Sequence, residues 1–159
     1  DMMALLHLDL SEISVVQKEK SCLAVVPVEQ ELPTAADVEQ VIGAVKRYKL
    51  QRLHDAVYGS MIAVDQLYQG SYDRYEALYV ELPRLSTQKG LHIRPGGQYL
   101  RAFCKGSWDN LPGRYEEIIA YARAHGLELY GYSYETGINE SVINGFDEYI
   151  TQIEIPIQI

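Results

Sequence analysis

The chain contains an internal duplication, which restricts the folds open to its 159 residues. Each half opens with a strand-like run and closes with an apolar one, and the run that opens the first half is kinked near Lys20 and Ser21. We therefore predict two related units, at 13–84 and 91–159, preceded at 1–12 by a linker or the end of a helix. The matching segments are 15–30 with 92–106, Leu32-Pro33 with Leu111-Pro112, Val41-Ile42 with Ile118-Ile119, Tyr58-Gly59 with Tyr130-Gly131, and Glu81-Leu82-Pro83 with Glu154-Ile155-Pro156.

Each unit has the pattern strand, helix, strand, strand. In the first unit, Thr34 is suited to cap a helix that runs to about Tyr48 with apolar residues at helical spacing, and strands follow at 57–65 and 74–82. In the second, a helix at 114–125 stops at Gly126, and strands follow at 129–136 and 148–157. This pattern predicts an α+β fold of two βαββ repeats with pseudo-two-fold symmetry. We expect a ligand pocket between the halves, because pockets favour interfaces between packed units.

Charge and composition exclude several classes of protein. The net charge of −8 argues against direct contact with nucleic acid, which needs a basic face. Cys22 and Cys104 lack metal-ligand spacing and are typical of buried thiols in a cytoplasmic protein, and the four histidines are scattered. No stretch is long and apolar enough to cross a membrane. We therefore expect neither a metal nor a cofactor.

A carboxylate among tyrosines is the most informative local feature. The chain has 13 tyrosines but only two phenylalanines and one tryptophan. Alternation along 129–136 places Tyr134 on one face of a strand and Glu135 on the other. The run 133–138 holds no lysine or arginine, so an inward-facing Glu135 either takes up a proton or binds a cation. The alternative is a solvated edge glutamate, with the tyrosines as ordinary strand residues.

Taken together, three segments resemble the GyrI-like effector-binding domain of MerR-type multidrug-responsive transcription regulators. They are KGSWDNLPGRYEEIIAYARAHGLELYG at 105–131, Tyr134-Glu135, and FDEYITQIEIPI at 146–157. The resemblance implies that lipophilic, often cationic molecules bind between the two halves.

The resemblance also assigns roles to particular residues. It implies that Glu135 pairs with the ligand's positive charge and that Tyr58 and Tyr149 line the pocket, with Tyr134 near them. Trp108, just before the second helix, is either a pocket wall or a lid over the edge of the core. A further pocket tyrosine of the family falls near Val38 or Gln40, where no aromatic residue stands. The candidates to replace it are Tyr68, Tyr72, Tyr75 and Trp108.

In this family a helix-turn-helix domain and a dimerisation helix precede the effector-binding domain. The resemblance therefore implies contact with DNA only through a part outside this chain, a possible homodimer of the full-length protein, and no membrane partner.

Two other functions stay open at this stage. Some proteins of this fold resemble hydrolases of electrophilic toxins, in which case Glu135 acts as general acid or base, assisted by Tyr149 or Tyr134. A third possibility is a protein-binding module that inhibits gyrase, although the sequence has no dense acidic strip.

Overall fold

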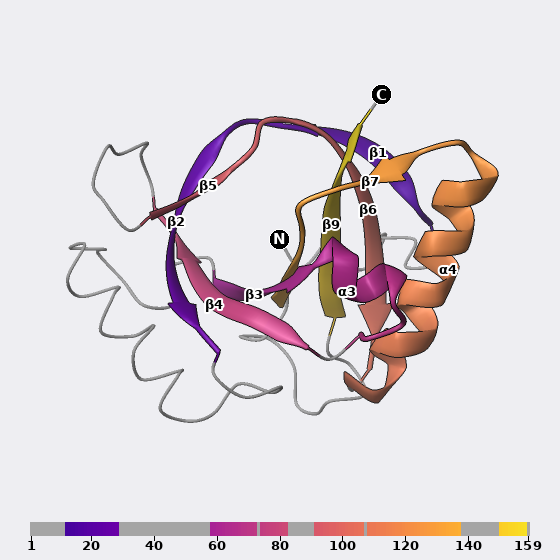
Figure 1. The fold of residues 1–159 in the computed structure, drawn as a ribbon, viewed down its shortest axis with the longest axis horizontal. Helices are drawn as coiled ribbons and strands as arrows, with labels where there is room; N and C mark the ends of the chain where they lie inside the picture. Colours follow the sequence, from indigo (N-terminus) through magenta and orange to yellow (C-terminus); the bar gives the residue numbers. More distant parts are fainter. Residues whose placement is uncertain are drawn as a thin grey trace, which may run out of the picture.

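A computed structural model describes residues 12–28, 58–72, 74–82, 91–106, 108–137 and 150–158. Most of these residues belong to nine strands, with one longer helix (Figure 1). No helix of the described ranges is long and apolar enough to cross a membrane. The elements are β1 (Ser14–Lys18), β2 (Ser21–Pro27), β3 (Tyr58–Ala63), α3 (Val64–Tyr68), β4 (Tyr75–Glu81), β5 (Leu91–Arg94), β6 (Gly97–Lys105), the 3-10 helix η2 (Trp108–Asn110), α4 (Leu111–Ala124), β7 (Glu128–Leu129), β8 (Tyr132–Gly137) and β9 (Ile150–Gln158).

The strands form one antiparallel sheet in the order β1-β6-β9-β8-β3-β4-β2-β5, and β7 adds to β9. The ends of this order are linked along the chain, because β1 leads into β2 and β5 leads into β6. At one end of this order β1 pairs with β6, and at the other end β5 pairs with β2. The sheet consequently curls into a ring, viewed nearly end-on in Figure 1.

The kink that the sequence predicts near Lys20 is confirmed. The ladder between β1 and β6 ends at Lys18 opposite Gly97, and the ladder between β2 and β5 begins at Ser21 opposite Arg94. Two unpaired residues separate β1 from β2, Glu19 and Lys20, and two separate β5 from β6, Pro95 and Gly96. Both segments therefore bend at the same place. A bend of this kind gives the sheet its strong curvature.

The predicted α+β class is confirmed, with two local differences. The strand expected at 57–65 ends at Ala63, and the chain continues as the short helix α3. The strand expected at 129–136 is divided between β7 and β8 by a turn at Gly131, whose φ is 70°. Gly59 lies inside β3, so the predicted match between Tyr58-Gly59 and Tyr130-Gly131 joins two different local structures.

The described strands of the two halves are arranged alike. The strand order is β2-β4-β3 in the first half and β6-β9-β8 in the second, the same arrangement of equivalent segments. The helix expected at 34–48 lies outside the described residues. The pseudo-two-fold symmetry therefore stays a prediction.

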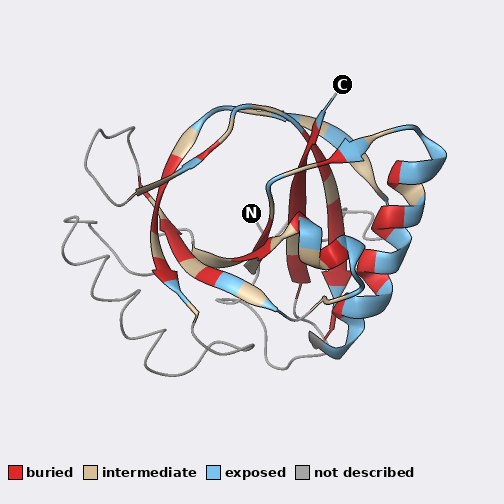
Figure 2. Ribbon diagram, viewed as in Figure 1, coloured by how far each residue is buried: buried red, intermediate tan, exposed pale blue. Residues whose placement is uncertain are grey.

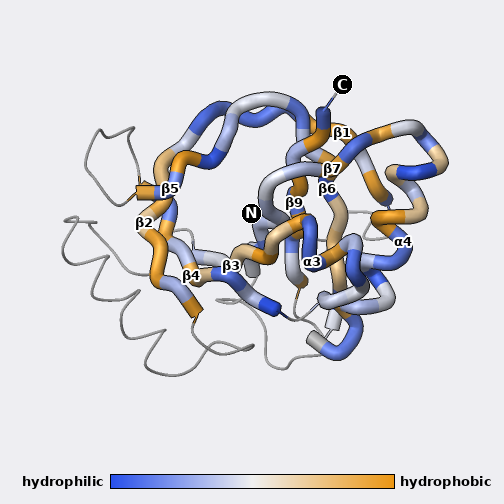
Figure 3. The backbone as a smooth tube through the Cα atoms, viewed as in Figure 1, coloured by the Kyte–Doolittle hydropathy of each residue, from blue (hydrophilic) through white to orange (hydrophobic). Residues whose placement is uncertain are grey.

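Helix α4 covers the outer face of β6 and β9. It begins at Leu111, earlier than the sequence predicts, with Pro112 in its first turn, where a missing N–H costs no hydrogen bond. Tyr115, Ile118 and Ala122 recur at helical spacing and are buried. Figure 2 shows this buried side turned towards the sheet, and Figure 3 shows hydrophobic and hydrophilic positions alternating along the helix.

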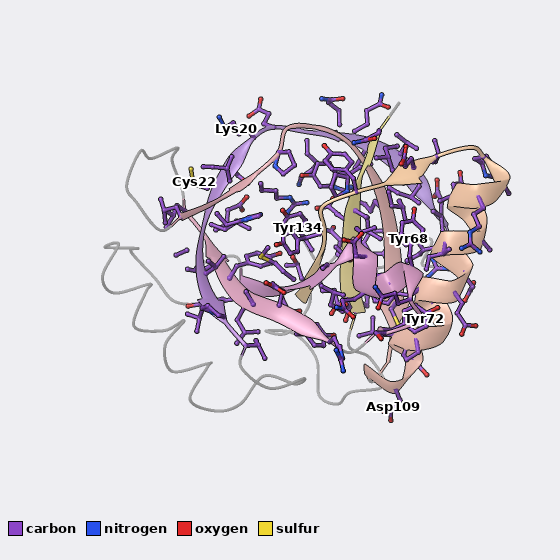
Figure 4. The ribbon with its side chains drawn as sticks, in the orientation of Figure 1. Lys20, Cys22, Tyr68, Tyr72, Asp109 and Tyr134 are labelled. Carbon is purple, nitrogen blue, oxygen red and sulfur yellow. The ribbon has the colours of Figure 1, made fainter. Side chains whose placement is uncertain are left out.

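The curled sheet has a second core on its inner face. Leu23, Met61, Tyr79, Tyr99 and Tyr134 pack together there, and all are at most 2% exposed. Tyr134 points into the ring in Figure 4. The outer face instead carries the cluster under α4 and a smaller one around Cys22 and Val80. Both cysteines are buried thiols, as the sequence predicts.

Candidate functional site

A buried carboxylate lies on the outer face of the sheet, at the junction of its two halves. Glu135 belongs to β8 and is 4% exposed. It pairs with Ser60 of β3 on one side and with Ile153 of β9 on the other. Strand β3 comes from the first half of the chain and β8 from the second, so the carboxylate lies at the seam where the sequence predicts a pocket.

Three hydroxyl groups donate hydrogen bonds to this carboxylate. The Tyr75 hydroxyl lies 2.8 Å from Oε1, and Ser60 Oγ lies 3.4 Å from the same oxygen. The Tyr115 hydroxyl of α4 donates to Oε2 and also lies 2.8 Å from Ser133 Oγ. Each half of the chain therefore supplies donors to one negative group.

A β-bulge places Tyr75 on the same face as Glu135. Between β3 and β4 the register shifts after Met61, so that Met61 lies opposite Ala77 and Ile62 lies opposite Tyr75. Directly paired residues share a face of the sheet, and the bulge leaves Glu76 without an opposite residue in β3. Without the shift, alternation from Ala77 and Tyr79 would turn Tyr75 towards the inside of the ring.

Tyr115 is positioned by the packing of α4. Its ring is fully buried and stacks against Tyr72, with centroids 5.9 Å apart and planes at 7°. Tyr72 is half-buried and lies near the lower end of α4 in Figure 4. The carboxylate thus has a pair of stacked aromatic rings beside it, one of which reaches the surface.

The surroundings of Glu135 make it harder to ionise than an exposed glutamate. Burial raises the pKa of Glu135 above its ordinary value of 4.5, and the hydrogen bonds from Tyr115, Tyr75 and Ser60 act in the opposite direction. Burial and the neighbouring Glu135 raise the pKa of Tyr115, which keeps its hydroxyl protonated as a donor. Within the part of the chain that the structure describes, no lysine or arginine forms an ion pair with Glu135.

The other predicted site residues do not gather around Glu135: Tyr58 and Tyr134 lie on opposite faces of the sheet. Tyr58 is half-buried on the outer face, packed against the cluster around Cys22 and Val80. Tyr134 lies on the inner face, where its hydroxyl is 2.7 Å from Nε2 of His92. The sheet therefore separates Tyr134 from the Glu135 carboxyl group. Tyr149 lies outside the described residues, and for Trp108 only the backbone, at the start of η2, is described.

The site includes residues that sequence reasoning did not assign. Tyr115 and Ser60 were missed, although the helical spacing of Tyr115 with Ile118 and Ala122 marks it as facing the sheet. Tyr75 was one of several candidates for the missing pocket aromatic, and the bulge that selects it has no clear sequence signal. No group of three or more His, Cys, Asp or Glu suited to a metal ion occurs among the described residues.

Comparison with known proteins places the fold. No family model matches the chain, and no curated protein matches it by sequence. Solved structures do match.

The cryo-EM structure of the EcmrR–DNA complex superposes with a TM-score of 0.66 at 14% identity, over 99% of this chain and 63% of that one. This chain thus spans less than two-thirds of the length of EcmrR. The crystal structure of the EcmrR C-terminal domain alone matches with a TM-score of 0.64 at 13% identity, over 94% of this chain and 99% of that one.

A hydrolase from Listeria innocua matches with a TM-score of 0.67 at 9% identity, over 99% of this chain and 97% of that one. SAV2435 bound to tetraphenylphosphonium matches with a TM-score of 0.56 at 14% identity, over 92% and 94% of the two chains. The chain therefore has the α+β GyrI-like fold of the EcmrR C-terminal domain, and a hydrolase shares that fold.

Proposed function

We propose that this domain binds lipophilic organic cations at Glu135 and serves as the effector-sensing part of a MerR-type transcription regulator. The observation that carries the proposal is a carboxylate 4% exposed that hydroxyls surround and that no described cation neutralises. Such a group is unfavourable as a bare anion and gains a partner when a cationic ligand arrives. Lipophilic cations suit it because they lose little hydration on entering an apolar site.

The aromatic groups beside Glu135 supply the rest of the recognition. A cation against the Tyr72–Tyr115 stack gains about 0.5–2 kcal/mol per ring face from cation–π attraction. Tyr75 keeps its hydroxyl on the carboxylate and its ring among the apolar residues under α4. Tyr58, Tyr149 and Trp108 complete the proposed pocket as the residues that the family resemblance assigns.

The structural neighbours support this choice of ligand and role. SAV2435, which shares the fold, has been solved with tetraphenylphosphonium, a lipophilic monocation. EcmrR, whose C-terminal domain shares the fold, has been solved on DNA. Since this chain carries a net charge of −8, the proposal assigns contact with DNA to a part of the protein outside this chain. Ligand binding changes that contact only through a difference in affinity between two arrangements of the whole protein.

The test is a calorimetric titration of tetraphenylphosphonium into the wild type and Glu135→Gln. We expect the substitution to weaken binding by about 30-fold or more, as for loss of a buried charged partner worth about 2 kcal/mol. Glu116→Gln, an exposed change on α4, is the matched control and should bind as the wild type does. Triphenylphosphine oxide, a neutral aromatic, should bind both proteins equally. Equal affinity of wild type and Glu135→Gln for the cation would contradict the proposal.

A second candidate function is hydrolysis of an electrophilic small molecule. The observation that favours it is the contact of two tyrosine hydroxyls with a carboxyl whose pKa is raised, since such a group keeps its proton to a higher pH than an exposed glutamate and can act as an acid or a base. A hydrolase shares the fold. Turnover of a reactive cyclopropane by the wild type, lost in Glu135→Gln, would establish catalysis; binding without turnover would exclude it for that substrate.

A further inference from the structure

The inner face of the curled sheet carries a cluster of charged residues with no role in the proposed cation site. Glu154 contacts three cationic side chains, those of Lys18, Arg94 and Arg101. We call these four residues the Glu154 cluster. The distances are 3.5 Å from Lys18 Nζ and 2.7 Å from an Arg94 amino group, both to Oε1, and 2.7 Å from an Arg101 amino group to Oε2. The pairing of Glu154 with Arg101 and Tyr134 places the cluster on the face opposite Glu135.

The charges of this cluster do not balance. Burial raises the pKa of Glu154, but the charges and hydrogen bonds of its three partners outweigh burial and lower it, so the carboxylate stays ionised. One negative charge therefore faces three positive ones, and among the described residues no other acid forms an ion pair with these cations. Glu154 is 1% exposed and Arg94 5%, so part of this positive excess is shielded from water.

Arg94 also retains an unused hydrogen-bond donor. Its guanidinium lies 4.4 Å from the ring centroid of Tyr134 and 4.8 Å from that of Tyr99, so aromatic rings contact its faces. Its Nε is buried and makes no hydrogen bond of acceptable geometry, although an interaction with the Tyr99 hydroxyl contributes to the raised pKa of Arg94. Buried guanidinium donors are almost always paired, because an unpaired one loses its hydration for no return. The Nε edge of the Arg94 guanidinium therefore lacks a well-placed hydrogen-bond acceptor.

The same cluster is open to solvent on one side. The side chains of Lys18 and Arg101 are 32% and 29% exposed. Lys18 and Arg94 contact the same carboxylate oxygen of Glu154, so their cationic groups lie close together. Lys18 is the last residue of β1, and the strand pairing is interrupted after it at Glu19-Lys20.

We propose that the Glu154 cluster is a second binding site, for a small oxyanion such as phosphate or a carboxylate, held by Lys18 and Arg94. The oxyanion supplies the missing negative charge and an acceptor for Arg94, and Tyr99 and Tyr134 fix the guanidinium that presents the donor. The site is independent of cation capture at Glu135, because the sheet lies between the two.

The proposal is tested by thermal unfolding and calorimetry of the full chain in sodium phosphate or sodium acetate, against sodium chloride at equal ionic strength and pH. We expect a saturable rise in melting temperature in at least one oxyanion, since a ligand that binds only the folded state stabilises it. Phosphate alone, acetate alone or both will show which oxyanion the site accepts. Equal melting temperatures in all three salts would overturn the proposal.

Substitutions at two neighbouring lysines locate the effect. Lys18→Met should weaken oxyanion binding by about tenfold, the loss of one charge-assisted hydrogen bond. Lys18→Arg should retain binding. Lys20→Met, an exposed change at the same bend, is the matched control, and equal affinities of Lys18→Met and Lys20→Met would count against the site. Tetraphenylphosphonium titration should be unchanged in Lys18→Met, which separates this proposal from the cation site.

Discussion

The hydroxyl of Tyr75 lies 2.8 Å from Oε1 of Glu135, although the alternation of its own strand would turn it to the opposite face. The bulge after Met61 reverses its direction and brings it to the carboxylate. A one-residue irregularity in the ladder thus determines which hydroxyl groups form hydrogen bonds with the buried carboxylate. Bulges are common beside functional sites because they re-aim side chains in this way.

Removing this hydroxyl should make Glu135 harder to ionise. Tyr75→Phe deletes a donor that favours the carboxylate, so the pKa of Glu135 should rise further and the pH at which cation affinity reaches half its maximum should move upwards. The free energy of unfolding should fall by about 1 kcal/mol. Titrating tetraphenylphosphonium from pH 5 to 9 measures the midpoint. The control Tyr132→Phe, on the inner face of β8, should leave this pH midpoint unchanged.

The wild type should lose stability as pH rises. A carboxyl whose pKa is higher in the folded state than in the unfolded state binds more protons when folded, between its ordinary value of 4.5 and its raised one. The contribution of Glu135 to the free energy of unfolding is therefore largest below pH 4.5 and declines as pH rises through the raised pKa. Urea unfolding at several pH values should show that Glu135→Gln lacks this decline and is more stable than the wild type at neutral pH. A parallel pH dependence of the two proteins would contradict this account.

Cation binding should release protons. Burial raises the pKa of Glu135 in the free domain, and a bound cation should lower it again and expel the proton. Calorimetric titration of tetraphenylphosphonium in phosphate and in Tris, whose ionisation enthalpies differ, measures the number of protons released at each pH. The number that the wild type releases should pass through a maximum above pH 4.5, and the enthalpy measured for Glu135→Gln should not depend on the buffer.

Much of this fold could be predicted from the sequence, because periodicity and turn residues act locally. The kink at Lys20, the position of α4 and the strands of the second half follow from apolar spacing and from Gly126, which has a φ of 66° past the end of the helix. The burial of Glu135 also follows from alternation once one face of β8 is known to be covered. The partners of Glu135 depend instead on contacts over long separations: Tyr75 is 60 residues away and its direction depends on a bulge. The Glu154 cluster was missed for the same reason, since its members come from four different strands.

Removing the charge of each of the two buried glutamates should change the free energy of unfolding in opposite directions. Glu135→Gln removes a charge that has no described cationic partner, whereas Glu154→Gln leaves Arg94 buried beside other cations. Removing one partner of a buried ion pair typically costs about 3–5 kcal/mol, and we expect a loss of that size for Glu154→Gln. Urea unfolding of both variants at pH 7.5 provides the comparison. Similar effects of the two substitutions would show that the charge environments do not differ as the structure indicates.

Substitution of Gly59 by even the smallest side chain should be destabilising, because the backbone of β8 and the ring of Tyr79 both lie against its Cα. A Cβ there would collide with the carbonyl oxygen of Glu135 and with the ring and hydroxyl of Tyr79, which itself bonds Thr136 at 2.7 Å. Since the carbonyl belongs to the β3–β8 ladder, relief requires moving β8 and with it the Glu135 carboxylate.

Overpacking of this kind costs about 3 kcal/mol, and we expect Gly59→Ala to lower both the free energy of unfolding and the affinity for tetraphenylphosphonium. Gly113→Ala is the matched control. It lies in α4 with open space around the added methyl group, so it should instead stabilise the domain by about 0.5–1 kcal/mol and bind the cation normally. Urea unfolding and calorimetry of the two variants measure both quantities, and unaltered stability in Gly59→Ala would mean that β3 and β8 are not held as closely as the structure places them.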